Sequence, residues 1–364
     1  MGAGIVGAAC AREFAENGLT TAVIESEAIG GGATAAGMGH IAVMDDSEAQ
    51  FALTRYSQLL WHELAHSLPH DVEYLPCGAI WVAADEIEML EVLRKQQFYT
   101  NRGVPAEVLD PRSLAEAEPN LRPGMAGALL LKDDAIIYPP CAARFLVMQA
   151  QRLGARLIFG RKAINTSGDE LHLDDGTTVA YAALVLANGI AASSLTKAAQ
   201  LEPRKGHLVI TDRHPGFVHH QIIELGYLKS AHSVRADSVA FNVQPRPSGQ
   251  VLIGSSRQYG VHEPAVDSSM VSAMLRRAFE YMPGLGRLSA IRSWTGFRAA
   301  TPDKLPLIGP SPDSENIYLA TGHEGLGITT SLATAKLLAD IVLGRESPIA
   351  REPYLPARSH ALHA

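Results

Sequence analysis

The residues Gly2-Ala3-Gly4-Ile5-Val6-Gly7 have the GxGxxG spacing that binds phosphate groups. Glycines at these positions allow a tight turn, close approach of the backbone to a pyrophosphate, and close packing of a helix on a strand. A helical stretch, a short β-branched strand and then Glu25 follow, and an acid at this distance can bind ribose hydroxyls. The pattern predicts a dinucleotide site, and the acid at position 25 disfavours the 2′-phosphate of NADP. The alternative is a glycine-rich turn that binds nothing.

One element is missing from this pattern. A doubly wound sheet places a buried strand directly before the glycine loop, whereas only Met1 precedes Gly2 in this sequence. We expect an upstream segment of about ten residues to supply that strand, either because the start codon is assigned too late or because the chain is truncated.

Three further stretches have residue types that suit a ligand. The run of small residues from Gly30 to His40 leaves room for a flat molecule against backbone amides. Asn188-Gly189 ends a buried strand, and ligands of α/β sheets meet the carboxyl ends of strands. Gly325-Leu326-Gly327-Ile328 opens the final helix, where backbone donors and the helix dipole attract negative charge. A plain turn between strand and helix is the alternative for this last stretch.

One family shares all of these stretches. The sequence resembles the FAD-dependent amine and amino-acid oxidoreductases of the D-amino acid oxidase and glycine oxidase group. The resemblance runs from Gly2 to about Gly344 and is most specific at 294–303, 305–309 and 320–328. Segment 35–46 most resembles flavin subunits of D-hydroxyproline dehydrogenases and opine oxidases. The resemblance implies FAD, and oxidation of the amine carbon of an amino or imino acid, with hydride passing from Cα–H to flavin N5 and an imine released.

The resemblance also assigns FAD contacts to small residues and backbone amides. These are Gly2, Ala3, Gly4, Ile5, Val6, Gly7, Glu25, Ala33, Thr34, Ala35, Ala36, Gly37, Met38, Gly39, Ala163, Asn188, Gly189, His323, Gly325, Leu326, Gly327 and Ile328. The first loop would take the pyrophosphate, Glu25 the adenosine ribose, and the strand at Ala163 the adenine. The last segment would meet the N1–C2=O edge of the flavin, where the reduced ring is negative.

Two residues are candidate catalytic groups. Arg298 is expected to bind the substrate carboxylate, as the matching arginine does in the family, because a planar fork of donors suits bidentate binding. A surface arginine or a structural ion pair is the alternative. His40 is expected to line the pocket as a donor or pH-sensitive group, unless local structure satisfies it. Tyr227 and Gln244 fall on expected strands that could roof the pocket.

The composition is that of a folded protein of about two domains. The chain has 364 residues, of which 47% are hydrophobic and 19% charged, and this excludes disorder, collagen and coiled coil. The net charge of −7 leaves no general basic surface for nucleic acid, and no apolar run reaches the roughly 18 residues of a membrane span. Cys10, Cys77 and Cys141 form no CxxC pair and no histidine spacing indicates a metal, so we expect no metal site and a cytoplasmic location.

Helix and strand patterns alternate in two blocks around a mostly antiparallel region. The expected helices lie at 8–17, 47–68, 85–102, 142–153, 270–282 and 331–343, the strands at 19–24, 79–83, 155–159, 183–187 and 317–320, and a hairpin at 171–179. The fold class is α/β (α+β overall), with a Rossmann-like FAD-binding domain and an inserted, mostly antiparallel substrate domain. The expected bounds are 1–75, 140–200 and 290–364 for the first domain, and 76–139 and 201–289 for the second.

We therefore expect an FAD-dependent oxidoreductase acting on CH–NH or CH–NH2 groups of a small amino or imino acid. One alternative is the flavin subunit of a larger dehydrogenase, which passes electrons to a partner subunit rather than to oxygen. The chain alone could also form a homo-oligomer. A weaker alternative is a non-catalytic FAD-binding scaffold.

The cofactor is expected to be FAD rather than NAD, because NAD binding needs only the first of the three flavin-type stretches. The purified protein should be yellow and should release FAD on denaturation, which absorbance and chromatography of the released cofactor measure. A colourless, well-folded protein that binds NADH would contradict this expectation.

Overall fold

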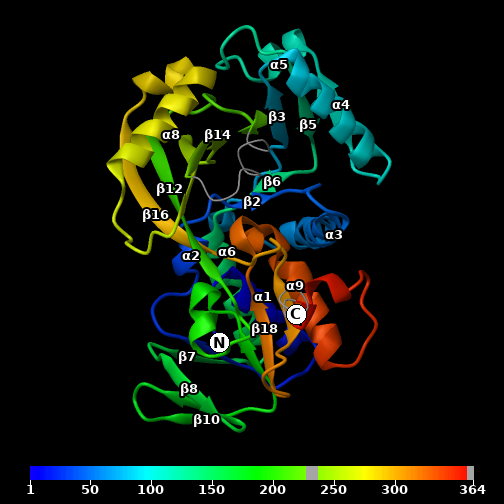
Figure 1. Ribbon diagram of the computed structural model, residues 1–364, viewed down its shortest axis with the longest axis vertical. Helices are drawn as coiled ribbons and strands as arrows, with labels where there is room; N and C mark the ends of the chain where they lie inside the picture. Colours follow the sequence, from blue (N-terminus) through cyan, green and yellow to red (C-terminus); the bar gives the residue numbers. More distant parts are fainter. Residues whose placement is uncertain (227–236, 359–364) are drawn as a thin grey trace. The chain divides into compact units, whose positions relative to one another are not determined.

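The computed structural model describes residues 1–226 and 237–358, which fall into two compact units (Figure 1). Unit 1 contains Met1–Val72, Tyr138–Pro203 and Phe297–Ala364, and unit 2 contains Glu73–Ile137 and Arg204–Gly296. The chain therefore leaves unit 1 twice and returns to it twice. Tyr227 lies outside the described residues.

The longer helices of unit 1 pack against one another. Its helices are α1 (Ile5–Glu16), α2 (Gly32–Ala35), α3 (Glu48–Ala65), α6 (Pro139–Arg152) and α9 (Gly327–Val342), with 3-10 turns η1 (His70–Val72), η2 (Gly189–Ser194), η4 (Glu324–Leu326) and η5 (Glu352–Tyr354). Helix α1 packs against both α6 and α9, and α9 also packs against α3. Helix α6 begins earlier than expected, because two prolines occupy its first turn, where a missing N–H costs no hydrogen bond.

Among the described helices, one stretch is long and apolar enough to cross a membrane. It is Glu324–Val342, which contains α9, and 61% of it is buried inside the fold. Core helices of globular proteins have the same composition.

The strands of unit 1 form short pairs, both parallel and antiparallel. They are β1 (Ala22–Glu25), β2 (His40–Ile41), β7 (Arg156–Phe159), β8 (Ala163–Ser167), β9 (Glu170–Leu173), β10 (Thr178–Ala180), β11 (Leu184–Leu186), β17 (Leu307–Pro310) and β18 (Ile317–Thr321). Strand β1 pairs with β7 in parallel, β11 pairs with β18 in parallel, and β17 runs antiparallel to β18. The antiparallel pair β9–β10 confirms the expected hairpin.

The first two residues join the parallel pairs. The N–H of Gly2 donates to the carbonyl of Ile24 in β1 at 2.8 Å, and the N–H of Ala187, directly after β11, donates to the carbonyl of Met1 at 2.9 Å. The terminal ammonium of Met1 donates to the carbonyl of Val185 at 2.7 Å. Met1 and Gly2 thus occupy the place between β1 and β11, where the central strand of a doubly wound sheet lies.

Unit 2 is one mixed sheet with helices. The strands are β3 (Ala79–Ala83), β4 (Ala106–Leu109), β5 (Gly127–Leu131), β6 (Ala135–Ile136), β12 (Glu202–Arg213), β13 (Gln221–Glu224), β14 (Ser238–Pro245), β15 (Gln250–Tyr259) and β16 (Ala290–Ala300); the helices are α4 (Glu86–Thr100), α5 (Pro111–Ala117), α8 (Ser268–Tyr281) and η3 (Pro283–Arg287). Eight of these strands form the sheet, in the order β16-β12-β15-β14-β13-β3-β5-β4, and β6 lies outside it. Strands β12 and β15, β15 and β14, and β14 and β13 are antiparallel, as expected, whereas β13 pairs with β3 in parallel.

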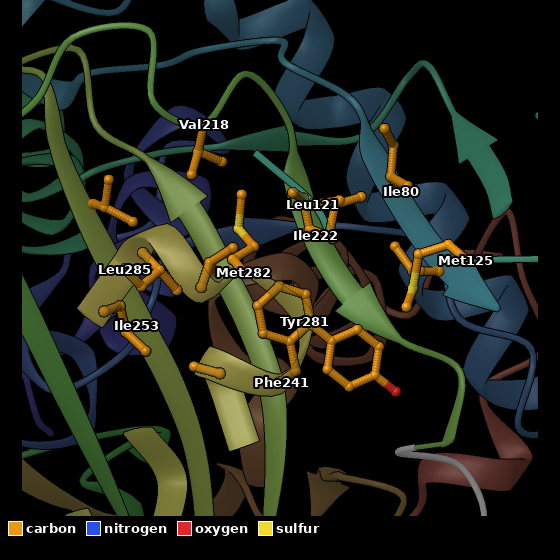
Figure 2. Packing of buried hydrophobic residues seen from close by; sticks show 14 of the residues in the cluster. Ile80, Leu121, Met125, Val218, Ile222, Phe241, Ile253, Tyr281, Met282 and Leu285 are labelled. Carbon is orange, nitrogen blue, oxygen red and sulfur yellow. The ribbon is translucent and has the colours of Figure 1, made fainter. Parts of the chain in front are cut away.

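The core of unit 2 lies between its sheet and helix α8 (Figure 2). The ring of Phe241 in β14 stacks on that of Tyr281 in α8, with centroids 4.6 Å apart and planes at 6°. Met282 and Leu285, which follow α8, fill the same cluster together with Ile253 of β15. This packing joins β14 and β15 to helix α8.

Replacing Gly7 by alanine should damage unit 1 more than an ordinary glycine substitution does. A Cβ at Gly7 would lie 2.0 Å from the carbonyl oxygen of Gly2, and that backbone atom must shift. We expect Gly7→Ala to lower the thermal midpoint by several degrees and to reduce retained FAD, as absorbance and a melting curve would measure. In the control Gly286→Ala the new Cβ meets only the Phe279 ring at 3.9 Å. Equal effects of both changes would contradict the argument.

Candidate functional site

The glycine loop turns directly into α1. Gly4 is the N-cap residue and has no side chain with which to cap the helix. The buried hydroxyl of Thr34 takes this role, because it accepts from the N–H of Ile5 at 3.0 Å. Within the described parts of the chain, no atom accepts from the N–H of Val6 or of Gly7. The amino end of α1 therefore offers two amide donors and a positive dipole to an anion.

Glu25 is the last residue of β1, and its side chain binds the backbone of the glycine loop. The N–H of Ala3 donates to its Oε2 at 2.7 Å, and the N–H of Glu27 donates to its Oε1 at 2.8 Å. A carboxylate oxygen accepts more than one hydrogen bond, so both oxygens can also accept from ribose hydroxyls. The N–H of Gly160 donates to the Glu25 carbonyl at 2.7 Å. This contact fixes the segment that leads into β8 and its first residue, Ala163.

The small-residue segment is fastened to the start of α9. It forms a short helix, α2, rather than a loop throughout. A Cβ on Gly37 would lie 2.6 Å from Cδ1 of Ile328. The hydroxyl of Thr329 donates to the carbonyl of His40 at 2.8 Å, and the N–H of Ala42 donates to the Thr329 hydroxyl at 3.4 Å. The backbone on either side of the half-buried His40 is thereby held in place.

Asn188 and Gly189 lie beside the glycine loop. A Cβ on Gly2 would lie 3.0 Å from Cα of Asn188. The Oδ1 atom of Asn188 is buried and accepts no hydrogen bond from the described residues. The hydroxyl of Thr321 donates to the carbonyl of Gly189 at 2.9 Å, which ties this segment to β18. A buried amide oxygen without a donor marks a position for an N–H or O–H of a ligand.

The amino ends of α1 and α9 are neighbours. A Cβ on Gly327 would lie 3.8 Å from Cγ2 of Val6 and 3.4 Å from Cβ of His323. The indole Nε1 of Trp61 in α3 donates to the carbonyl of Ile328 at 3.3 Å and fixes the first turn of α9. Because helix dipoles are positive at their amino ends, these two ends together create a region that favours negative charge.

Arg298 lies at the edge of this region. It is half-buried near the end of β16, and Ala300 of that strand bridges to His323. The Cδ and Nε atoms of Arg298 lie 3.7 Å from the position that a Cβ on Gly325 would take. The Cδ–Nε part of the Arg298 side chain thus lies against the turn that leads into α9.

The structure brings most of the predicted site residues together in unit 1. The segments that meet are Gly2–Gly7, 33–40, Asn188–Gly189, Arg298 and 323–328, whereas Gln244 is buried in β14 of unit 2. Sequence reasoning missed Thr329 and Trp61, which fasten this region. The sequence does give a signal for Thr329, since hydroxyl residues in the first turn of an apolar helix often bond backbone groups. It gives no such signal for the hydrogen bond of Trp61.

His323 is buried, and its Nε2 lies 3.0 Å from the hydroxyl of Thr334. Burial lowers the pKa of its imidazole to about 3. The ring is therefore neutral near neutral pH, and it adds no charge beside α9.

This buried histidine makes stability depend on pH in a defined window. The unfolded chain binds a proton there near the ordinary pKa of about 6.5, whereas the folded chain does so only near 3. Its contribution is complete above the unfolded value and falls by about 1.4 kcal/mol per pH unit as the pH drops toward the folded value. We expect His323→Gln to remove this slope in urea unfolding with excess FAD. The exposed control His66→Gln should keep it, and an unchanged slope in His323→Gln would contradict the assignment.

Comparisons with known proteins identify the family. The model of the DAO family, described as FAD dependent oxidoreductase, matches residues 1–341. Glycine oxidase from Geobacillus kaustophilus is 28% identical over 97% of this chain and 94% of its own, and D-amino acid dehydrogenase from Vibrio cholerae is 26% identical over 82% and 71%. The crystal structure of the Geobacillus kaustophilus glycine oxidase covers 98% of this chain and 97% of its own, with a TM-score of 0.87 at 26% identity. The chain belongs to the DAO family of FAD dependent oxidoreductases, which are enzymes that use FAD as their cofactor.

Proposed function

We propose that this enzyme oxidises the amine carbon of a small amino or imino acid, and that Arg298 binds the carboxylate of that substrate. The observation that carries the proposal is the position of Arg298 against Gly325, at the amino end of α9. Relatives named glycine oxidase and D-amino acid dehydrogenase support this substrate class. A substrate of this class has one carboxylate, which Arg298 would bind, and one C–N bond, which would be oxidised.

The residues of unit 1 fit FAD. Val6 and Gly7 offer the amides that would hold the pyrophosphate, and the anchored carboxylate of Glu25 would accept from the adenosine ribose. The buried Oδ1 of Asn188 has no donor among the described residues, so a hydroxyl of the cofactor would satisfy it. Gly2 leaves no space for a side chain beside the loop.

The other assigned residues would contact the rest of the cofactor. Segment Ala33–Gly39 would face the phosphates and ribityl chain, with Met38 and Gly39 near the ring, and Ala163 would lie near the adenine. Residues 325–328 and His323 would border the N1–C2=O edge. The family resemblance implies these roles. The neighbouring amino ends of α1 and α9 support the last of them, because they favour the negative charge of a reduced flavin.

Bound FAD supplies the acceptor for two electrons from the substrate. The chain's own residues orient the reacting carbon, and positioning of this kind supplies a large part of a rate enhancement. A guanidinium fixes a carboxylate through two parallel hydrogen bonds, which sets the direction of the Cα–H bond. Because His323 is neutral, it does not compete with Arg298 for the carboxylate. His40, whose backbone is held by Thr329, would line the substrate pocket as a donor.

The electron acceptor separates two candidate functions. A relative named D-amino acid dehydrogenase favours transfer of electrons to a partner, whereas one named glycine oxidase favours oxygen. Oxygen consumption measured beside reduction of a quinone or dye acceptor distinguishes the two. Anaerobic bleaching of the flavin by glycine, sarcosine, D-amino acids, D-hydroxyproline and opines would name the substrate. No bleaching by any of them would favour a scaffold that binds FAD without turnover.

The change Arg298→Ala should leave FAD bound and should impair substrate binding. Loss of a charge-assisted bidentate pair costs about 3 kcal/mol, which is roughly two orders of magnitude in kcat/KM. Arg298→Lys should recover little, because an ammonium group cannot reproduce the planar fork. Steady-state kinetics and flavin absorbance measure both variants.

The substrate ester provides the control for this role. The methyl ester should be a poor substrate of the unmodified enzyme, and Arg298→Ala should reduce turnover of the ester much less than turnover of the acid. Equal losses on acid and ester would assign Arg298 a structural role and would reopen the substrate class.

A further inference from the structure

Helix α4 of unit 2 exposes large apolar side chains to solvent. Ile87 and Leu90 are 69% and 68% exposed, and Leu93 is 52% exposed. Spaced three residues apart, they follow one side of the helix. These three residues are called the α4 stripe. The opposite side of α4 is already used for packing, since Val92 and Tyr99 are fully buried there.

The charges around the α4 stripe are unequal at its two ends. The exposed N-cap residue Asp85 and the exposed Glu86 lie at the start of the helix, the exposed Arg94 lies in its second half, and the exposed Arg102 follows its end. The guanidinium of Arg94 is held on the solvent side by Glu91, at 2.8 Å and 2.6 Å. An acidic start and a basic end complement a second helix of the same sequence that runs in the opposite direction.

We propose that α4 is a self-association surface on which two copies of the chain pack their α4 helices antiparallel about a two-fold axis at Leu90. This axis places Leu90 against Leu90 of the second copy, and Ile87 against Leu93 of the second copy. It also places Glu86 opposite Arg94 of the second copy, and the two helix dipoles oppose each other favourably. A parallel arrangement would instead place Glu86 against Glu86.

The size of the surface sets the expected affinity. A stable subunit interface buries roughly 800 Å² on each partner, and one 15-residue helix face provides less than this area. The dimer is therefore weak and depends on concentration, with a Kd on the order of micromolar. The inference does not depend on the proposed substrate, because no residue of the α4 stripe belongs to the candidate site.

Sedimentation velocity of the full-length, FAD-loaded protein between about 1 and 100 µM tests the proposal. The dimer fraction should rise with concentration, and Leu90→Glu should raise Kd at least tenfold while flavin absorbance stays unchanged. The matched control Leu153→Glu changes another apolar side chain that is 50% exposed, at the end of α6, and should leave Kd unchanged. A monomer at every concentration, or a dimer that Leu90→Glu leaves intact, would overturn the proposal.

Two further variants test the direction of the helices. Glu86→Arg and Arg94→Glu should each weaken the dimer, and the double variant should restore it, because the opposed charges are only exchanged. Leu90→Cys places a thiol on the two-fold axis and should give a disulfide-linked dimer under mild oxidation, whereas Leu153→Cys should not. Failure of the double variant to restore association would overturn the antiparallel arrangement. Binding of a monomeric protein to anionic lipid vesicles through Leu90 would make lipid the occupant and would overturn self-association.

Discussion

Unit 1 depends on the close approach of one helix to one turn of backbone. A Cβ on Gly7 would lie 2.0 Å from the Gly2 carbonyl, and a Cβ on Gly2 would lie 2.7 Å from the carbonyl of Ala187. Because neither residue has a side chain, α1 begins directly after the segment between β1 and β11. Its first-turn amides then open toward the same region as those of α9, and Val6 reaches Gly327. A side chain at either glycine would separate the two positive helix ends on which the candidate site depends.

Neutral hydroxyl groups fasten the segments around these helix ends. Thr34 bonds the backbone of Ile5, Thr329 bonds that of His40, and Thr321 bonds that of Gly189. Each of these contacts joins parts of the chain that are far apart in sequence without adding a charge. The electrostatic character of the site therefore depends on the helix dipoles, on the carboxylate of Glu25 and on Arg298, and the buried neutral ring of His323 does not alter it.

Patterns of neighbouring residues predicted the loops, strands and turns whose conformation depends on neighbouring residues. Glycine spacing indicated the loop before α1, the apolar run 183–187 indicated a buried strand that the parallel pair β11–β18 confirms, and Asp175-Gly176 indicated the hairpin. The family and the FAD fold class were also predicted correctly. Contacts between distant segments gave no such signal. Thr329 and His40 are 289 residues apart, and nothing in either segment specifies the other. The parallel pairing of β13 with β3 was not predicted for the same reason.

The two interruptions of unit 1 determine the order in which it can fold during synthesis. Helix α1 is synthesised before α9, yet the ion-pair partner of its Glu13 is Lys336 in α9, 323 residues later in the chain and 2.9 Å away. At about 5–20 residues per second, this partner appears roughly 15–65 s after α1. The part of α1 that packs against α9 lacks its partner for that time, whereas α6, its other partner, and all of unit 2 have already been synthesised. Such non-local contacts slow folding, so the packing of α1 is complete only after the residues of α9 have been added.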